Sequence, residues 1–337
     1  MEVLVVSEAE VPLLLPMKEC IDLMAETLSA LAREEALMPL RSVMWLPERV
    51  GALAAMPSYL PKIGMMGIKV ISVFPSNRGT DLESHQGAVL LFEVERGQLL
   101  AIIDATSITA IRTPAVSAAA TRVLANPDAG DLAILGSGTQ ARTHLEAMLL
   151  VRSIHRVRIW SRSEANAQRF AKLESVRHGV RIEVEPTARD AVRGADLICT
   201  TTSSQQPILE GDWLAPGAHV NAIGAVGPTA RELDTAAIAR ALLFVDRRES
   251  AENEAGEFVV ARQEGAIGGE HIQGEIGELL IGKVTGRLSP KTITVFRAVG
   301  LAIEDLTAAQ HVYRKAVEQG VGTRVELGGL RPQEVSP

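Results

Sequence analysis

The chain has 337 residues, which is long enough for two domains. It is 47% hydrophobic and 22% charged with a formal net charge of −7, values typical of a globular protein and unfavourable for binding nucleic acid or an anionic membrane. The N-terminus lacks the positive region of a signal peptide, and no apolar run is long enough to span a membrane. Cys20 and Cys199 form no metal motif, so we expect a cytoplasmic protein.

The first third of the chain predicts an antiparallel sheet with helices around it. Residues 3–6 read as a strand, and a helix with apolar residues at helical spacing follows over 17–35. Turn signals separate several strand-like runs, which cover residues 42–46, 51–56, 67–74, 87–93 and 99–104. An alanine-rich helix is expected over residues 108–124.

A glycine-rich turn follows the apolar strand 131–135. Gly136 and Gly138 suit a tight turn at which the protein backbone can approach a ligand, and Ala141 is the small residue that lets helix and strand pack closely. The helix over 142–150 then presents its N-terminus to a pyrophosphate. An ordinary strand–helix turn has the same composition, but a second strand at 157–160 completes a β-α-β unit and favours a dinucleotide site.

The alternation of strands and helices continues to residue 245. Further strands are expected at 182–184, 196–200, 219–223 and 241–245, with helices over 163–178 and 187–193. A long helical pattern over 292–319 is expected to pack back on the first domain. The predicted fold is therefore α/β: a Rossmann-type, doubly wound parallel sheet in residues 125–290, and an α+β substrate-binding and dimerisation domain in 1–124 plus 291–337. A homodimer through the sheet of residues 39–110 is plausible.

The end of the second parallel strand bears on the choice of cofactor. It reads Ser161, Arg162 and Ser163, without the carboxylate that usually binds the ribose hydroxyls of NAD. Hydroxyl and guanidinium groups suit a 2′-phosphate, so we expect NADPH, with NADH possible. Ser163 can also cap the next helix while Arg162 is solvated, and the two interpretations are compatible.

Three cations occur in unusually apolar surroundings. Arg41 precedes a strand, Lys69 lies within one, and Arg112 lies in a helix that is otherwise poor in charge. Each alone suits a surface or ion-paired residue. Together they suggest a pocket for a substrate carboxylate, with Lys69 as an acid or base. By contrast, His144 suits a packing or surface position, and Glu252, Glu254 and Glu257 suit a solvated face.

The sequence resembles the ornithine cyclodeaminase/mu-crystallin family over nearly its whole length. The motifs that carry the resemblance are Gly67-Ile68-Lys69-Val70, Thr109-Ala110-Ile111-Arg112-Thr113, Gly136-Ser137-Gly138-Thr139-Gln140-Ala141, Asn221-Ala222-Ile223-Gly224-Ala225, Arg231-Glu232-Leu233-Asp234 and Gly274-Glu275-Ile276-Gly277-Glu278-Leu279. The resemblance implies a dinucleotide domain, a substrate domain that dimerises and a buried site between them. It also implies that Arg41, Lys69 and Arg112 contact the substrate carboxylate and the reacting centre. The expected cofactor-binding residues are Gly136, Ser137, Gly138, Thr139, Gln140, Ala141, Ser161, Arg162, Ser163, Thr201, Ala222 and Gly224.

One position departs from the cyclodeaminases of this family. They carry an aspartate that handles the amino group and water during deamination, where this chain has Val226. A valine can take no proton, so the segment resembles the mu-crystallin type, whose activity is the reduction of cyclic ketimines with NADPH. The resemblance thus implies an NAD(P)H-dependent imine reductase that acts on a cyclic ketimine or on an acyclic imine such as iminosuccinate. An NAD-dependent cyclodeaminase, an alanine-dehydrogenase-like enzyme and a non-catalytic binding protein stay open as alternatives.

Overall fold

A computed structural model describes residues 2–77 and 80–329 of the chain. The chain divides into two compact units, and each combines segments that are distant in sequence. The first unit comprises Met1–Pro16, Glu34–Ile111 and Ala302–Pro337, and the second comprises Met17–Arg33 and Arg112–Leu301. The predicted division into 1–124 plus 291–337 and 125–290 differs from this one at residues 17–33, 112–124 and 291–301, which belong to the second unit.

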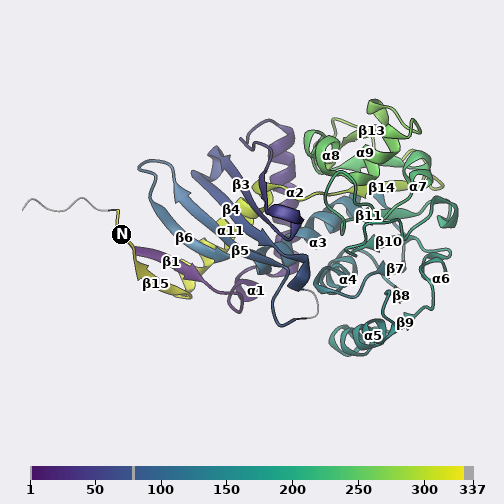
Figure 1. Cartoon of the computed structure of the whole chain (residues 1–337), viewed down its shortest axis with the longest axis horizontal. Helices are drawn as coiled ribbons and strands as arrows, with labels where there is room; N and C mark the ends of the chain where they lie inside the picture. Colours follow the sequence, from purple (N-terminus) through teal and green to yellow (C-terminus); the bar gives the residue numbers. More distant parts are fainter. Residues whose placement is uncertain (1, 78–79, 330–337) are drawn as a thin grey trace, which may run out of the picture. The chain divides into compact units, whose positions relative to one another are not determined.

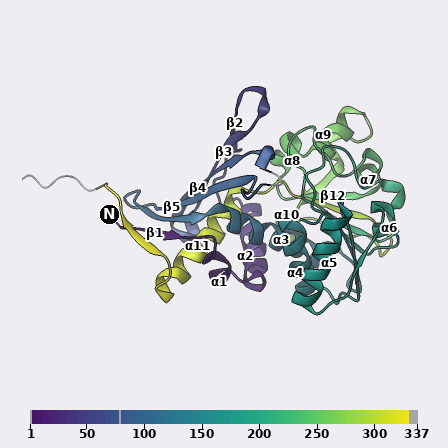
Figure 2. The ribbon, with the colours of Figure 1, turned by 60° about the horizontal axis from the view of Figure 1, so that its bottom comes forward.

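The first unit is built on a mainly antiparallel sheet, as predicted. Its strands lie in the order β15-β1-β6-β5-β4-β3-β2, and β1 is parallel to β6 whereas the other neighbours are antiparallel. The β2–β3 hairpin lies at one edge of this sheet (Figure 2). The strands are β1 (Glu2–Val6), β2 (Ser42–Trp45), β3 (Ala52–Leu60), β4 (Met65–Val73), β5 (His85–Glu93), β6 (Leu99–Asp104) and β15 (Thr323–Glu326).

One face of this sheet is covered by the helix α11 (Ala302–Gln319), which packs against β3, β4 and β5 (yellow in Figure 1). Alternate residues of β3 and β4 point toward the helix, because side chains of a strand alternate between its two faces. A side chain at Gly67 would come within 2.9 Å of Leu306 on α11. The short helix α1 (Val11–Leu14) also contacts α11.

The second unit contains the predicted parallel sheet. Its strand order is β13-β12-β14-β11-β10-β7-β8-β9, and all neighbouring strands are parallel, which confirms the doubly wound α/β class. The order reverses between β7 and β10. The strands are β7 (Asp131–Leu135), β8 (Arg156–Trp160), β9 (Ile182–Val184), β10 (Leu197–Thr200), β11 (His219–Ala222), β12 (Leu242–Val245), β13 (Ile272–Glu275) and β14 (Thr294–Arg297).

Helices connect the parallel strands and cover the sheet. In Figure 2, α4 and α5 lie side by side, and they are in contact. The helices that contribute residues to this unit are α2 (Met17–Ala32), α3 (Ala105–Leu124), α4 (Thr139–Val151), α5 (Glu164–His178), α6 (Ala188–Val192), α7 (Thr235–Arg240), α8 (Arg248–Glu254), α9 (Gly256–Gln263) and α10 (Ile276–Leu280). None of the helices in the described parts of the chain is both long and apolar enough to cross a membrane.

The expected helix over residues 292–319 is wrong in its first third. Residues 294–297 form β14, which pairs with β11 and β12 inside the parallel sheet, and the helix α11 begins only at Ala302. All four residues of β14 are buried, so their side chains show no alternation of polar and apolar types. A strand buried on both faces cannot be distinguished from a buried helix by periodicity alone.

Candidate functional site

The turn after β7 requires glycine at its first position. Gly136 has a φ of +123°, and its N–H donates to the carbonyl of Trp160 at 2.8 Å. A Cβ atom at this position would lie 2.7 Å from Oγ1 of Thr201 and 2.8 Å from the Thr201 carbonyl oxygen. Only glycine therefore lets the end of β7 approach the end of β10 so closely.

The N-terminus of α4 fits the pyrophosphate of a dinucleotide. Gly138 is the N-cap residue, and no side chain among the described residues caps the helix there. A Cβ atom built at Gly138 would meet no described atom within 4 Å, so the surrounding space is open. Thr139 and Gln140 begin the helix with Ala141 buried behind them, and the uncapped N–H groups with the helix dipole favour an anion.

The end of β8 places two hydroxyl groups and a guanidinium near the glycine turn. The Ser137 hydroxyl donates to Oγ of Ser161 at 2.9 Å, which links the turn to the second strand. Ser163 caps α5 by accepting from the N–H of Asn166 at 3.3 Å, and Arg162 is exposed. Ser161 and Arg162 are therefore available to a ribose phosphate, whereas Ser163 has a structural role.

The carboxyl ends of β10 and β11 carry three more of the predicted cofactor residues, Thr201, Ala222 and Gly224. The N–H and the hydroxyl of Thr201 both donate to the Leu135 carbonyl, at 2.8 and 3.1 Å. Ala222 is the last residue of β11 and is fully buried. A Cβ atom at Gly224 would lie 2.0 Å from the carbonyl oxygen of Thr202, so two backbones meet here as well. The twelve predicted cofactor residues thus follow the carboxyl edge of one sheet.

A buried carboxylate under this edge was not predicted from the sequence. Glu232 has no exposed surface, and it accepts hydrogen bonds from Thr200, Thr202 and Gly224 at the ends of β10 and β11. Its own N–H donates to Oε1 of Glu257 at 2.8 Å. The motif Arg231-Glu232-Leu233-Asp234 contributes to the family resemblance, which implies no role for Glu232.

The predicted solvated face of Glu252, Glu254 and Glu257 is wrong for Glu257. This residue lies on α9, and its carboxylate is 2.7 Å from Nε of Arg297, with both side chains 1% exposed. The Arg297 guanidinium also donates to the carbonyls of Ala222 and Ala225. A buried carboxylate requires such a partner, because desolvation without one is costly.

The second unit also contains Arg112, on α3. Arg112 is buried, and a Cβ atom at Gly300 would lie 2.9 Å from both terminal nitrogens of its guanidinium. Gly300 has a φ of +80° and donates its N–H to Oδ2 of Asp246 at 2.8 Å. The guanidinium therefore lies against a backbone that only glycine can form. Val226 follows in the loop after β11 and is 49% exposed.

In the first unit, Lys69 is buried on β4 and faces α11. Its ammonium lies 2.6 Å from Oδ2 of Asp305, and the two side chains are 2% and 1% exposed. Asp305, in the first turn of α11, was not among the predicted site residues. Arg41 is partly exposed just before β2. Whether Arg41 and Lys69 meet Arg112 and the dinucleotide edge in one site stays a prediction.

His144 has a packing role, which is one of the two positions that the sequence left open for it. His144 is fully buried on α4, where its Nδ1 lies 2.7 Å from the Gln140 carbonyl oxygen and its Nε2 lies 2.9 Å from Oγ of Ser117. Burial lowers the pKa of His144 to about 4, so the ring is neutral at pH 7. In the described residues no group of three or more histidine, cysteine or acidic side chains could hold a metal ion.

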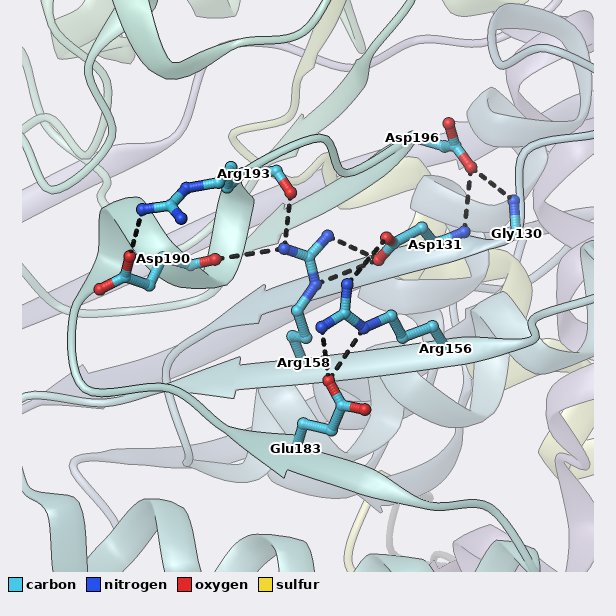
Figure 3. Close-up of polar contacts among 8 residues, drawn as sticks. All are labelled: Gly130, Asp131, Arg156, Arg158, Glu183, Asp190, Arg193 and Asp196. Atoms are coloured by element: carbon cyan, nitrogen blue, oxygen red, sulfur yellow. Dashed lines mark hydrogen bonds and ion pairs between the residues drawn. The ribbon is translucent and has the colours of Figure 1, made fainter.

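The opposite, amino-terminal edge of the parallel sheet carries an ionic network (Figure 3). The buried guanidinium of Arg158 on β8 donates to Oδ1 of Asp131 on β7 at 2.6 Å and to the Arg193 carbonyl at 2.7 Å. Arg156 reaches Glu183 on β9 at 2.7 Å. These contacts tie β7, β8, β9 and the end of α6 together. Because the network lies at the edge away from the glycine turn, we interpret it as structural.

Comparison with known proteins identifies relatives over the whole chain. Residues 1–320 match the model of the ornithine cyclodeaminase/mu-crystallin family. The ketimine reductase mu-crystallin of Mus musculus is 40% identical over 277 residues, which is 82% of this chain and 84% of that protein. The structure of Thermococcus litoralis Delta(1)-pyrroline-2-carboxylate reductase in complex with NADH and L-proline has a TM-score of 0.93 at 36% identity, and covers 96% of this chain and 100% of that one. An archaeal alanine dehydrogenase dimer with bound NAD has a TM-score of 0.92 at 34% identity, and covers 97% of this chain and 100% of that one.

Proposed function

The chain belongs to the ornithine cyclodeaminase/mu-crystallin family, and from this membership we propose that it reduces the C=N bond of a small imino acid. It is an oxidoreductase that uses a nicotinamide dinucleotide. The substrate carries an α-carboxylate, and cyclic ketimines such as pyrroline-2-carboxylate or piperideine-2-carboxylate are the first candidates, followed by iminosuccinate. When bound, the reduced nicotinamide supplies a hydride to the imine carbon, and the product is an amino acid.

The observation that carries this proposal is the buried ion pair of Lys69 and Asp305. An ammonium held 2.6 Å from a carboxylate is oriented by it. Such a group can hydrogen-bond the imine nitrogen and protonate it. The resemblance implies that Lys69 contacts the reacting centre, and this supports a chemical role for the pair.

Arg112 and Arg41 bind the substrate carboxylate. A guanidinium matches a carboxylate in a two-pronged contact and keeps its charge at all working pH values. The Gly300 backbone against the Arg112 guanidinium limits its freedom, which orients the substrate for hydride transfer.

Val226 argues against the cyclodeaminase alternative. Its apolar side chain is 49% exposed in the loop after β11 and can neither accept a proton nor hold an ammonium group. Without an acidic group at this position, the chain lacks the residue that the family's cyclodeaminases use for deamination. Reduction needs no such group, because the nitrogen stays in the product.

We infer that NADPH is preferred over NADH. Support comes from the end of β8, where Ser161 is linked to the glycine turn and Arg162 is exposed, and where no acidic side chain occurs between residues 160 and 163. A carboxylate there would repel a 2′-phosphate, whereas a guanidinium attracts it.

We also infer a cytoplasmic homodimer that forms through residues 39–110. The edge strand β2 exposes Val43, Met44 and Trp45, and a hollow of about 450 Å³ on the same sheet is lined by apolar residues that include Tyr59 and Met66. A second copy of the chain would cover this surface. Sedimentation at micromolar concentration tests this inference, and a monomer alone would contradict it.

A panel of cyclic and acyclic imino acids, each assayed with NADPH and with NADH, tests the proposed reaction. We expect cofactor oxidation in proportion to amino-acid formation with at least one imino acid. Incubation with L-ornithine and NAD is the control, and we expect no ammonia from it. Catalytic formation of proline from ornithine would support the cyclodeaminase instead, and binding without turnover of any imine would support a non-catalytic protein.

A further inference from the structure

Four hydrogen bonds converge on the buried carboxylate of Glu232. Oε2 accepts from the Thr200 hydroxyl at 2.9 Å and from the Gly224 N–H at 2.7 Å. Oε1 accepts from the N–H and the hydroxyl of Thr202, at 2.6 and 2.7 Å. One side chain thus binds the residues that end β10 and those that follow β11.

The backbone that Glu232 holds also meets the glycine turn. Thr201 lies between the two threonines that contact Glu232, and Gly136 approaches Thr201 so closely that a Cβ atom would lie 2.7 Å from Oγ1. On its other side, Gly224 leaves no room for a side chain against Thr202, whose carbonyl oxygen would be 2.0 Å away. A shift of the carboxylate would therefore move the backbone beside the turn.

Glu232 is also hydrogen-bonded to a second buried carboxylate, Glu257. Its N–H donates to Glu257, and Glu257 binds Arg297, which donates to the Ala222 carbonyl at 3.1 Å. Because Ala222 is the last residue of β11, this network also contacts the end of that strand. Burial raises the pKa of Glu232, and the hydrogen bonds from Thr202 oppose this rise.

The strand order indicates which part of a dinucleotide lies over this network. In a doubly wound sheet the pyrophosphate crosses the point where the strand order reverses, here between β7 and β10. A dinucleotide bound in this way would place its adenosine half toward β8 and Ser161, and its nicotinamide half over the ends of β10 and β11. We propose that Glu232 is a positioning residue that sets the backbone of Thr202 and Gly224 for the nicotinamide half. This rests on the proposed function, because it requires a dinucleotide.

Binding of NADH and of ADP, measured by calorimetry, tests the inference on Glu232→Gln. The amide can accept at one oxygen only, and its NH2 group opposes the donors on the other side. We expect NADH to bind about tenfold or more weakly, because the backbone of Thr202 and Gly224 is no longer held by both carboxylate oxygens. ADP, which lacks the nicotinamide half, is expected to bind within about twofold of its affinity for the unmodified protein.

Two further variants make the result unambiguous. Thr200→Val removes one donor to Glu232 from a fully buried position that a cofactor cannot touch, so it should weaken NADH binding in the same direction. It keeps the Glu232 carboxylate and its other three hydrogen bonds, so it is the smaller change and tests the inference if Glu232→Gln does not fold. Asp234→Asn is the matched control, because Asp234 lies on the same segment but binds the N–H groups of Gly211 and Ala237 instead.

The outcomes separate the two proposals. NADH affinity unchanged in Glu232→Gln and Thr200→Val, or an equal loss of NADH and ADP, would overturn the positioning role. Failure of the unmodified protein to bind either NADH or NADPH would contradict the proposed function itself.

Discussion

The ammonium of Lys69 lies 2.6 Å from Oδ2 of Asp305, and both side chains are almost completely buried. The pair joins β4 to the first turn of α11 within one unit. It combines a candidate proton donor with a carboxylate that orients it. Lys69, which the sequence suggests as an acid or base, thus acquires a specific partner that can be tested by mutation.

We expect Lys69→Met to lower kcat by about 10²–10⁴-fold on the best imine, because the variant keeps the aliphatic stem and removes the proton donor. Asp305→Asn should lower kcat by less and change the pH dependence of kcat, since the ammonium loses its charged partner. Ser58→Ala is the control, because it removes a different contact between β3 and α11, a 3.0 Å hydrogen bond to the Ala302 carbonyl. Steady-state kinetics across pH provide the measurement, and full kcat in Lys69→Met would show that the proton comes from another group.

Arg112 should act mainly in binding. Arg112→Lys loses the two-pronged contact and is expected to raise KM for the imino acid more than it lowers kcat. Gly300→Ala should act in the same direction without touching the substrate, because its Cβ atom would lie 2.9 Å from the guanidinium. Gly282→Ala is the matched control: this glycine has a similar φ of +75°, and its Cβ atom would meet no described atom within 4 Å. Equal KM values in the two glycine variants would contradict the role given to Gly300.

The parts of the site that the sequence predicted are those that depend on local patterns. The glycine turn, the capping Ser163 and the alternation of strands and helices follow from turn chemistry and from periodicity, which act within one β-α-β unit. The Glu257–Arg297 and Lys69–Asp305 pairs join residues 40 and 236 positions apart, and nothing in a local window indicates which charge is buried. Neither Glu257 nor Asp305 could therefore be distinguished from the charges of a solvated helix face before the fold was known.

The cofactor preference should depend on the end of β8. We expect NADPH to bind at least about tenfold more tightly than NADH, because charge-assisted hydrogen bonds are worth about 1.5–3 kcal/mol. Replacing Ser161 by Asp and Arg162 by Gln should reverse the preference, since the carboxylate would accept from the ribose hydroxyls and repel a phosphate. Ser163 is left unchanged because it caps α5. Dissociation constants from fluorescence titration test this, and equal affinities in the unmodified protein would refute it.

The buried histidines should make the fold sensitive to acid. Burial lowers the pKa of His144 to about 4, below the ordinary value of 6.5. As the pH falls below 6.5, the unfolded chain binds a proton at this residue and the folded chain does not, so the free energy of unfolding decreases until the pH approaches 4. The slope per histidine is at most about 1.4 kcal/mol per pH unit. His219, whose pKa burial lowers to about 3, should add a similar contribution.

Urea unfolding at a series of pH values between about 6.5 and 4.5 measures this slope. The free energy of unfolding of His144→Gln should depend less steeply on pH than that of the unmodified chain, because glutamine does not titrate. The difference in slope corresponds to at most about one proton. The variant should also be less stable at pH 7, since the amide replaces only part of the bonding to Ser117 and the Gln140 carbonyl. His155→Gln, at an exposed position, is the matched control and should leave both stability and slope nearly unchanged. An identical slope in His144→Gln and the unmodified chain would show that another group causes the acid sensitivity.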